Sequence, residues 1–334
     1  WIITFQMLLI PAIALLGSYD PTTSLGAVAV TAAIVAVCSA SQDVVLDAYM
    51  ADLLLPVERA AGSASYVIGY RVALLVTGTL ALIVADFVPW RLVYWGLAGL
   101  MGVAVVATLM AEEPPAAVCP PRTLLEAVWL PFRQLLTRRG VFWILLFVAL
   151  YKFGDHLADA QKSTFLRGEL QFTKTELATL QKILGFGGIL VGGMTAGFIA
   201  ARAGVRWALI TFGVLQAATN LLFTAMAIVG KNYVMLATSV FADNVTGAMG
   251  TTAFVAFLMA QTDREVSATQ YALLTSLSSI GNRVFGWTSG EVVVGFGFAG
   301  FYAFTAAIAI PGILIALLMP REATDRVPTT PKLG

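Results

Sequence analysis

Long apolar stretches recur along the whole chain, and short polar segments separate them. About 20 consecutive apolar residues in helical form span the hydrocarbon core of a bilayer. The pattern therefore predicts ten membrane-spanning helices: residues 1–17, 25–48, 60–85, 92–111, 141–161, 174–201, 207–229, 233–260, 268–293 and 296–319. We expect an all-α integral membrane protein.

The composition supports this fold class and excludes others. Of the 334 residues, 59% are hydrophobic and only 12% are charged, unlike soluble globular domains. A net charge of +1 gives no reason to expect a nucleic-acid partner. Cys38 lies in an apolar run and Cys119 in a Pro-rich segment, so no disulfide framework is predicted. Trp1 lies directly in apolar sequence without an initiator Met or a signal peptide, and we expect the chain to begin partway through a longer protein.

A polar segment, residues 112–140, divides the predicted helices into four before it and six after it. The predicted domains are the remainder of an N-terminal helical bundle (1–111), a linker with a short amphipathic helix (112–140), a six-helix C-terminal bundle (141–320) and a tail (321–334). A faint repeat, Gly69-Tyr-Arg71-Val and Gly281-Asn-Arg283-Val, recurs six helices apart. Two parallel six-helix halves joined by a linker resemble the major facilitator plan. On that plan ten of twelve helices are present, and the first two are missing.

The distribution of basic residues predicts the orientation in the membrane. Lys and Arg concentrate on the side of the linker, whereas Arg91, Arg167, Lys174 and Lys231 fall on the opposite side. Because basic residues favour the cytoplasmic side, we expect the linker and the C-terminus to be cytoplasmic.

One predicted helix, residues 141–161, carries charges that lipid does not tolerate. Lys152, Asp155, Asp159 and Lys162 follow at i, i+3, i+7 and i+10, so they line one face. A charge at the bilayer centre costs at least ~2.5–3.5 kcal/mol, so this row should face protein or water and is a functional-site hypothesis. Lys182 on the next helix reaches a comparable depth as a partner for Asp155. Alternatively, Lys152 and Asp155 satisfy each other within the helix.

The first half carries a second group of charges. Asp43 and Asp47 are i,i+4 neighbours beside Gln42, and Arg71 on the next helix lies at a similar depth. A carboxylate without a nearby cation has its pKa raised in apolar surroundings and can carry a proton. We hypothesise proton coupling or gating by Asp43, Asp47, Arg71, Asp155 and Lys182. The alternative is that Asp47 marks the membrane edge and that Asp43 and Arg71 form a packing pair.

Other motifs have plainer interpretations. The glycines between Gly185 and Gly197 lie in an apolar helix and follow no strand, so they indicate helix packing and not a dinucleotide loop. His156, the single histidine, has no set of metal-ligand partners, so a zinc site is rejected.

The combined motifs resemble the bacterial AmpG-type muropeptide permeases of the major facilitator superfamily. They are Ser-Gln-Asp43-x-x-x-Asp47-Ala-Tyr49, Gly69-Tyr-Arg71, Tyr151-Lys152-x-Gly-Asp155, Gln181-Lys182-x-x-Gly185, Asn244-x-x-Gly-x-Met-Gly-Thr251 and Ala-Thr269-Gln270-Tyr271. The family's Gly/Arg loop motif is matched in degenerate form by Gly197, Arg202, Gly204 and Arg206. Two departures are the missing first helices and Gln181, where the family usually has Asn. Related acetyl-CoA transporters tend to continue their acidic motif with Gly-Trp, whereas Asp47 here precedes Ala48-Tyr49.

This resemblance implies proton-driven import of anhydro-muropeptides, N-acetylglucosaminyl-anhydro-N-acetylmuramoyl peptides, across the bacterial inner membrane for cell-wall recycling. It implies a monomer that is not an enzyme and has no cofactor. The expected substrate-binding residues offer aromatic faces, amides and cations: Gln42, Tyr66, Tyr70, Tyr151, Lys152, Asn244, Gln270 and Tyr271, with Arg71 and Lys182 as further cations for carboxylates. An acetyl-CoA or other solute transporter of the superfamily, an integral-membrane transferase and a signalling receptor are the alternatives.

Overall fold

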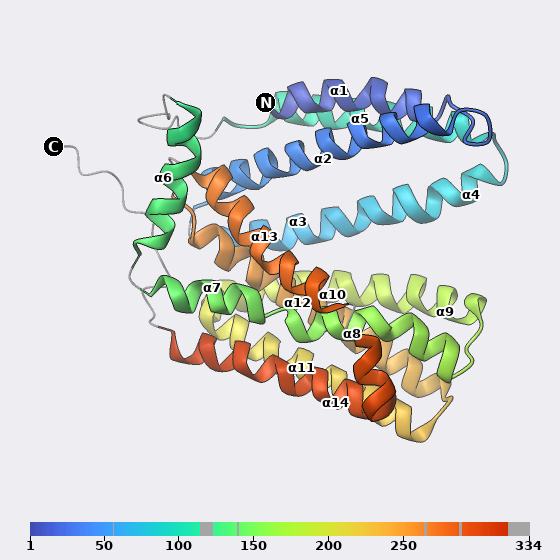
Figure 1. The fold of residues 1–334 in the computed structure, drawn as a ribbon, viewed down its shortest axis with the longest axis vertical. Coiled ribbons are helices and arrows are strands. Elements are labelled where there is room, and N and C mark those ends of the chain that lie inside the picture. Colours follow the sequence, from blue (N-terminus) through green and yellow to red (C-terminus); the bar gives the residue numbers. More distant parts are fainter. Residues whose placement is uncertain (56, 114–122, 139, 264–265, 287–288, 320–334) are drawn as a thin grey trace. The chain divides into compact units, whose positions relative to one another are not determined.

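The computed structural model describes residues 1–55, 57–113, 123–138, 140–263, 266–286 and 289–319. For residues 124–128, 174, 178, 182 and 280–286 it describes the backbone but not the side chains. Its helices, drawn in Figure 1, are α1 (Ile2–Leu16), α2 (Leu25–Leu53), α3 (Arg59–Leu74), α4 (Ala81–Ala85), α5 (Trp90–Met110), α6 (Leu124–Leu136), α7 (Val141–Leu150), α8 (Phe153–Thr164), α9 (Lys174–Leu180), α10 (Phe186–Ala203), α11 (Val205–Val229), α12 (Tyr233–Ala260), α13 (Ser267–Gly286) and α14 (Ser289–Leu318). Three π-helical turns link some of them: η1 (Leu75–Leu80), η2 (Phe165–Glu169) and η3 (Gln181–Gly185). The described part of the chain is therefore all-helical, as predicted.

The observed helices differ from the predicted ones mainly where a span is interrupted. Three predicted spans contain a π-turn or a break, because helical periodicity does not reveal one extra residue in a turn. The last span also bends: within α14, Gly297 has φ 67° and ψ 174°, which separates its first two turns from the rest. Glycine adopts such a conformation without steric penalty. The predicted division between residues 293 and 296 lies close to this point.

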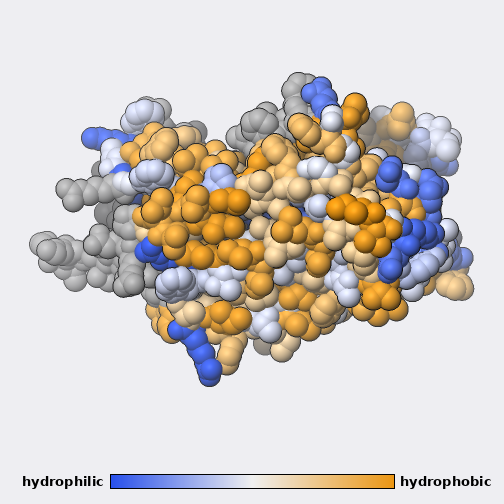
Figure 2. Space-filling view, turned by 90° about the horizontal axis from the view of Figure 1, so that it is seen from below, coloured by the Kyte–Doolittle hydropathy of each residue, from blue (hydrophilic) through white to orange (hydrophobic). Residues whose placement is uncertain are grey.

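Seven of the described helices or helix pairs are long and apolar enough to cross a membrane. They lie at Leu25–Leu53, Arg59–Ala85, Trp90–Met110, Val141–Glu169, Ile183–Ala203, Val205–Val229 and Ser289–Leu318. Helix α1, with 15 residues, is a shorter apolar helix, and α12 and α13 fall outside this set. Figure 2 shows hydrophobic residues over the middle of the viewed face and hydrophilic residues toward its ends, as a membrane protein requires.

The chain forms two compact units. The N-terminal unit contains Trp1–Leu53 and Gly69–Pro120, and the C-terminal unit contains Leu54–Ile68 and Pro121–Gly334. The predicted domain boundaries at 111 and 140 stay a prediction, and so does the tail 321–334, which lies outside the described residues. Helix α6 falls within the predicted linker segment.

Each unit has its own packing. In the N-terminal unit α1 packs against α2 and α5, and the Gln6 amide donates to the Thr108 hydroxyl at 2.9 Å. In the C-terminal unit α11 packs against both α12 and α14, and α10 packs against α12. The core of the second unit is aromatic at its centre, where Phe165, Phe223 and Tyr302 are buried in mutual contact. This packing holds α8, α11 and α12 in fixed positions, and these helices carry the charged residues described next.

Candidate functional site

The charged row begins at a break in its helix. Helix α7 ends at Leu150, and α8 begins at Phe153 after Lys152, whose φ of −97° and ψ of 0° depart from helical values. The predicted continuous helix over residues 141–161 is therefore wrong in this detail. Helix α14 comes very close here, since a Cβ on Gly154 would lie 2.6 Å from the Thr305 carbonyl oxygen.

Lys152 is buried at this break, with only 8% of its surface exposed. Its Nζ lies 3.3 Å from Asp155 Oδ2 and donates to Gln216 Oε1 at 3.5 Å. Gly250 on α12 leaves room for the ammonium, because a Cβ there would lie 3.1 Å from Nζ. Two further helices thus enclose a cation that apolar surroundings alone would not tolerate.

Nearly three turns further along the chain, near the end of α8, Lys162 joins two carboxylates. Its Nζ pairs with Asp159 on its own helix and lies 2.7 Å from Asp243 Oδ2 on α12. The ammonium also lies 5.3 Å from the centre of the Phe223 ring, within range of a cation–π contact. We call Lys152, Asp155, Asp159, Lys162 and Asp243 the charge cluster.

The charge cluster is not neutral when every group is ionised. Its two lysines and three carboxylates sum to a formal charge of −1. The surplus charge is at the exposed edge of the cluster, because the Asp159 side chain is 63% exposed, whereas the other four are at most 18% exposed. Uptake of one proton or of one cationic group would neutralise the cluster, so this arrangement is suited to exchanging a proton or holding a charged ligand.

Several predicted substrate residues are held by protein contacts in the C-terminal unit. The Tyr151 hydroxyl donates to the Leu209 carbonyl at 2.9 Å, and its ring stacks on Phe254. The Asn244 amide donates to the Val240 carbonyl at 2.8 Å. Tyr66 is half-buried on α3, and Tyr271 is 2% exposed. Their predicted contact with substrate stays a prediction.

Gln270 belongs to a hydrogen-bonded network around Arg138. The Arg138 guanidinium binds the Gln261 carbonyl and the Asp263 carboxylate, and it donates to Gln270 Oε1 at 3.1 Å. The same Gln270 oxygen accepts the Asp263 backbone N–H at 2.8 Å. Gln270 is fully buried, so this network fixes the connection between α12 and α13.

The glycines of α10 confirm the predicted helix packing. A Cβ on Gly188 would lie 2.9 Å from the Phe241 carbonyl oxygen, and one on Gly192 would overlap the Val245 carbonyl. Gly197 faces the other way, where a Cβ would lie 3.1 Å from Ala64 Cβ on α3. Small residues thus allow close approach on two sides of the helix.

The Gly/Arg loop motif forms the turn between α10 and α11. Gly204 has φ 83°, a conformation that favours glycine, and it precedes α11. Arg206 donates to the Leu317 carbonyl, and the Arg202 guanidinium lies 4.0 Å from the centre of the Phe198 ring.

The acidic motif of the N-terminal unit is arranged differently. Asp43 is exposed on α2, while Gln42 and Asp47 are half-buried. The Arg71 guanidinium lies 6.0 Å from the centre of the Tyr70 ring. Among the described residues the ion pairs do not include one between Asp43 and Arg71.

Two further predictions concern Lys182 and metal binding. The Lys182 side chain lies outside the described residues, so its predicted pairing with Asp155 stays a prediction, while Asp155 also lies 3.3 Å from Lys152 Nζ. Within the described ranges, His, Cys, Asp and Glu form no group of three that could hold a metal ion. His156 is half-buried on α8, the helix that carries most of the charge cluster.

Sequence reasoning left three participants out of the predicted site: Asp243, Gln216 and Arg138. Asp243 is an acid in the middle of a predicted span, so the rule that singled out Asp155 applies to it equally. Gln216 is a buried amide on α11, one turn before the buried amide of Asn220. Arg138 gave no signal, because its partners lie more than 120 residues away.

Comparisons with known proteins give a consistent result. The profile of the Major Facilitator Superfamily matches residues 1–158. The "Anhydromuropeptide permease" of Escherichia coli K12 is 40% identical over 326 residues, which cover 97% of this chain and 66% of that protein. An "Uncharacterized protein" of Haemophilus influenzae is 33% identical, covering 94% of this chain and 76% of its own length. The chain thus spans 66% of the length of its E. coli relative.

Solved structures agree on the fold. The E. coli fucose:proton symporter FucP superposes with a TM-score of 0.72 at 13% identity, covering 96% of this chain and 83% of that one. At this identity the likeness concerns the fold alone, and it confirms the predicted major facilitator fold. The E. coli relative is named a permease, and the matching profile is that of the Major Facilitator Superfamily, in agreement with the expectation that this chain is not an enzyme.

Proposed function

Because the chain belongs to the AmpG-type permease family of the major facilitator superfamily, we propose that it imports anhydro-muropeptides by proton symport for peptidoglycan recycling. The name of its E. coli relative supports the substrate class. The observation that carries the proposal is the charge cluster, with five ionisable groups on helices of a membrane protein. Charges in such a place generally serve ion or substrate pathways.

The substrate and the proton would use different features of the site. An anhydro-muropeptide presents sugar rings, amides and carboxylates, which aromatic, amide and cationic side chains recognise. The net charge of the cluster supports proton coupling, since a proton on one of its three carboxylates makes it neutral. We assign that proton to Asp155. Its cation, Lys152, also donates to Gln216, whereas Asp243 has a closer ion pair with Lys162.

The location and assembly follow from the same proposal. The protein lies in the bacterial inner membrane, its linker and C-terminus face the cytoplasm, and it works as a monomer. The bias of basic residues supports the orientation.

The decisive experiment is uptake of labelled anhydro-muropeptide into vesicles that contain the full-length protein. We expect accumulation driven by an inward proton gradient and abolished by an uncoupler. Uptake that is insensitive to the uncoupler would exclude symport and leave facilitated transport. Binding without accumulation would favour a receptor instead.

A further inference from the structure

Two adjoining hollows lie at one end of the C-terminal unit, where α8 ends and α9 begins. The first has a volume of ≈ 570 Å³ and is lined mainly by polar groups, among them Ser163, Thr164, Arg167, Gln171 and Thr173. The second has ≈ 420 Å³ and includes Asp159, Lys162 and Gln181. Ser163 and Arg167 line both hollows, so the two adjoin at these residues. The second hollow, whose wall also includes Leu166 and Leu177, thus brings Arg167 close to the outer part of the charge cluster.

Arg167 is the cation between the two hollows, and it is unpaired. Its side chain is exposed, and within the described ranges no ion pair or hydrogen bond engages its guanidinium. The nearby carboxylate of Glu176 is occupied by Tyr233 and Lys231. The five N–H groups of Arg167 are thus available to a ligand.

The π-turn η2 explains why Arg167 reaches this space. In a regular α-helix Arg167 would lie about 140° around the axis from Lys162. A π-turn holds more residues per turn, which rotates Arg167 back toward Lys162, and both side chains line the second hollow. Gln181, on the opposite wall, belongs to the π-turn η3. Single π-turns are frequent at functional sites, and here two of them face one hollow.

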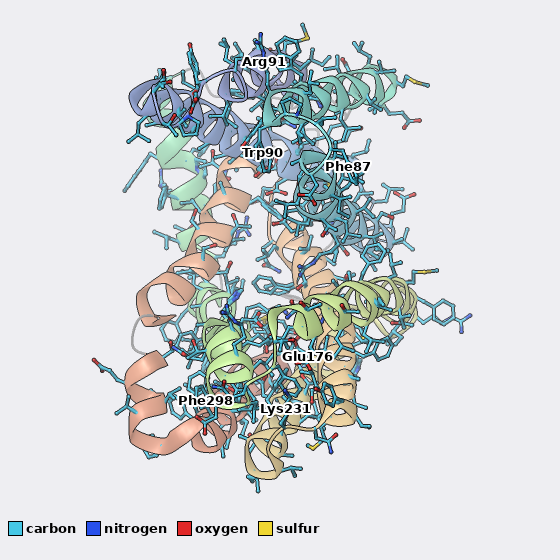
Figure 3. The ribbon with its side chains drawn as sticks, turned by 90° about the vertical axis from the view of Figure 1, so that its right-hand side faces the viewer. Phe87, Trp90, Arg91, Glu176, Lys231 and Phe298 are labelled. Atoms are coloured by element: carbon cyan, nitrogen blue, oxygen red, sulfur yellow. The ribbon has the colours of Figure 1, made fainter. Side chains whose placement is uncertain are left out.

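The outer wall of the first hollow is held in place. The Lys231 ammonium donates to the Gln171 carbonyl at 2.9 Å and lies 4.8 Å from the centre of the Phe172 ring. The same ammonium lies 3.6 Å from Glu176 Oε2, and Figure 3 shows Glu176 and Lys231 at the same end of this unit. The Gln171 amide closes the turn on the Gly168 carbonyl at 2.5 Å. The hollow is therefore largely formed before any ligand arrives.

We infer that this hollow is a binding subsite for a carboxylate at the peptide end of the substrate, with Arg167 as the residue that receives it. The inference rests on the proposed function. Arginine binds a carboxylate through two parallel hydrogen bonds, which gives affinity and orientation together. The hydroxyls of Ser163 and Thr164 and the Gln181 amide suit the neighbouring peptide amides. The volume of each hollow is within the range of small-molecule sites.

The test compares two substrates and two arginines in vesicles containing the full-length protein. The substrates are an anhydro-muropeptide with free peptide carboxylates and the same molecule with those carboxylates converted to amides. The variants are Arg167→Gln and Arg91→Gln; Arg91 is exposed and stacks on Trp95 in the N-terminal unit. We expect Arg167→Gln to weaken binding of the acid about tenfold or more and to leave binding of the amide unchanged. Arg91→Gln should change neither.

Each other outcome has a distinct meaning. If the wild-type protein binds acid and amide equally and Arg167→Gln changes neither, the subsite is wrong while the proposed function stands. If the wild-type protein binds neither molecule, the proposed function itself fails. A loss in Arg167→Gln that occurs only in vesicles with anionic lipid would mean that Arg167 holds a lipid phosphate, which also overturns the subsite.

Discussion

The two units differ in how the intramembrane charges described above are paired. In the C-terminal unit, Lys152 and Lys162 each contact a carboxylate, and two or more helices enclose them. In the N-terminal unit, Asp43 is exposed, and Arg71 lies 6.0 Å from the centre of the Tyr70 ring and makes no ion pair among the described residues. A paired cluster can persist in a dry environment, whereas a lone charge needs water or a ligand. Charges of the first kind should therefore govern stability as well as transport, and those of the second kind transport alone.

The strongest test of this contrast removes the cation that two carboxylates share. Lys162→Met leaves the buried Asp243 carboxylate without its cation, whereas the exposed Asp159 stays hydrated, and breaking a buried pair in this way costs about 3–5 kcal/mol. We expect a large fall in the thermal unfolding temperature of the detergent-solubilised protein. The double variant Lys162→Met/Asp243→Asn should recover part of the loss, because it removes the stranded charge.

The matched variant in the other unit is Arg71→Met. It should lower the unfolding temperature far less, since no ion pair is broken among the described residues. Equal losses in Lys162→Met and Arg71→Met would contradict the distinction between the two units.

The packing that positions the charge cluster can be tested with two glycines of one helix. Gly192→Ala places a methyl group on the Val245 carbonyl and should destabilise the protein by about 1–3 kcal/mol. Gly187→Ala has nothing within 4 Å of the new methyl group, so it should be neutral or stabilising by up to about 1 kcal/mol. Unfolding in a denaturant series measures both. If both substitutions had the same effect, close approach of α10 to α12 would not be what holds this part of the fold.

Much of the fold could be predicted from the sequence because lipid imposes a strict rule on length and polarity. The apolar runs located the helices, and the glycines of α10 indicated close packing, which Gly188 and Gly192 confirm. The breaks could not be predicted. The interruption at Lys152 lies beside a close approach of α14 at Thr305, a residue more than 150 positions away.

Of the candidate site, only the row of charges along α8 could be predicted from the sequence. Spacing along α8 placed Lys152, Asp155, Asp159 and Lys162 on one face, and the structure keeps them in contact with partners. The partners of the two lysines could not be predicted, because Asp243 and Gln216 come from other helices. Periodicity gives the face of a helix but not the residue that lies opposite.

A smaller effect on stability, with a large effect on transport, is expected for Asp43→Asn. The side chain is exposed and unpaired among the described residues, so the unfolding temperature should change by the equivalent of less than about 0.5 kcal/mol. Proton-driven uptake of anhydro-muropeptide should fall at least about tenfold if Asp43 carries or gates the proton. Full uptake with normal stability would show that Asp43 is not a functional residue. Proton coupling would then be assigned to residues of the C-terminal unit.

The smallest effect concerns one acid outside the membrane in each unit. Hydrogen bonds from the Tyr233 hydroxyl and the Thr173 backbone lower the pKa of Glu176 from 4.5 to about 2. In the N-terminal unit, hydrogen bonds from Thr22 lower the pKa of Asp20. A lowered pKa contributes stability that is present above the ordinary value and is lost as the pH falls through the folded value. Glu176 contacts α12 and Lys231, whereas Asp20 contacts only a residue two positions away.

Amide hydrogen exchange can separate these two acids. At pH 6 the backbone amides of residues 170–176 should exchange more slowly in wild type than in Glu176→Gln. This difference should disappear as the pH falls from 4.5 to 2. Asp20→Asn should affect only the turn around residues 20–24, because its bonds are local. Glu169→Gln is the control, since Glu169 is exposed and makes no ion pair within the described ranges. The difference between wild type and Glu176→Gln could instead persist unchanged at pH 2. The charge of Glu176 would then not be what holds this loop against α12, and the outer wall of the first hollow, which Arg167 lines, would depend on Lys231 alone.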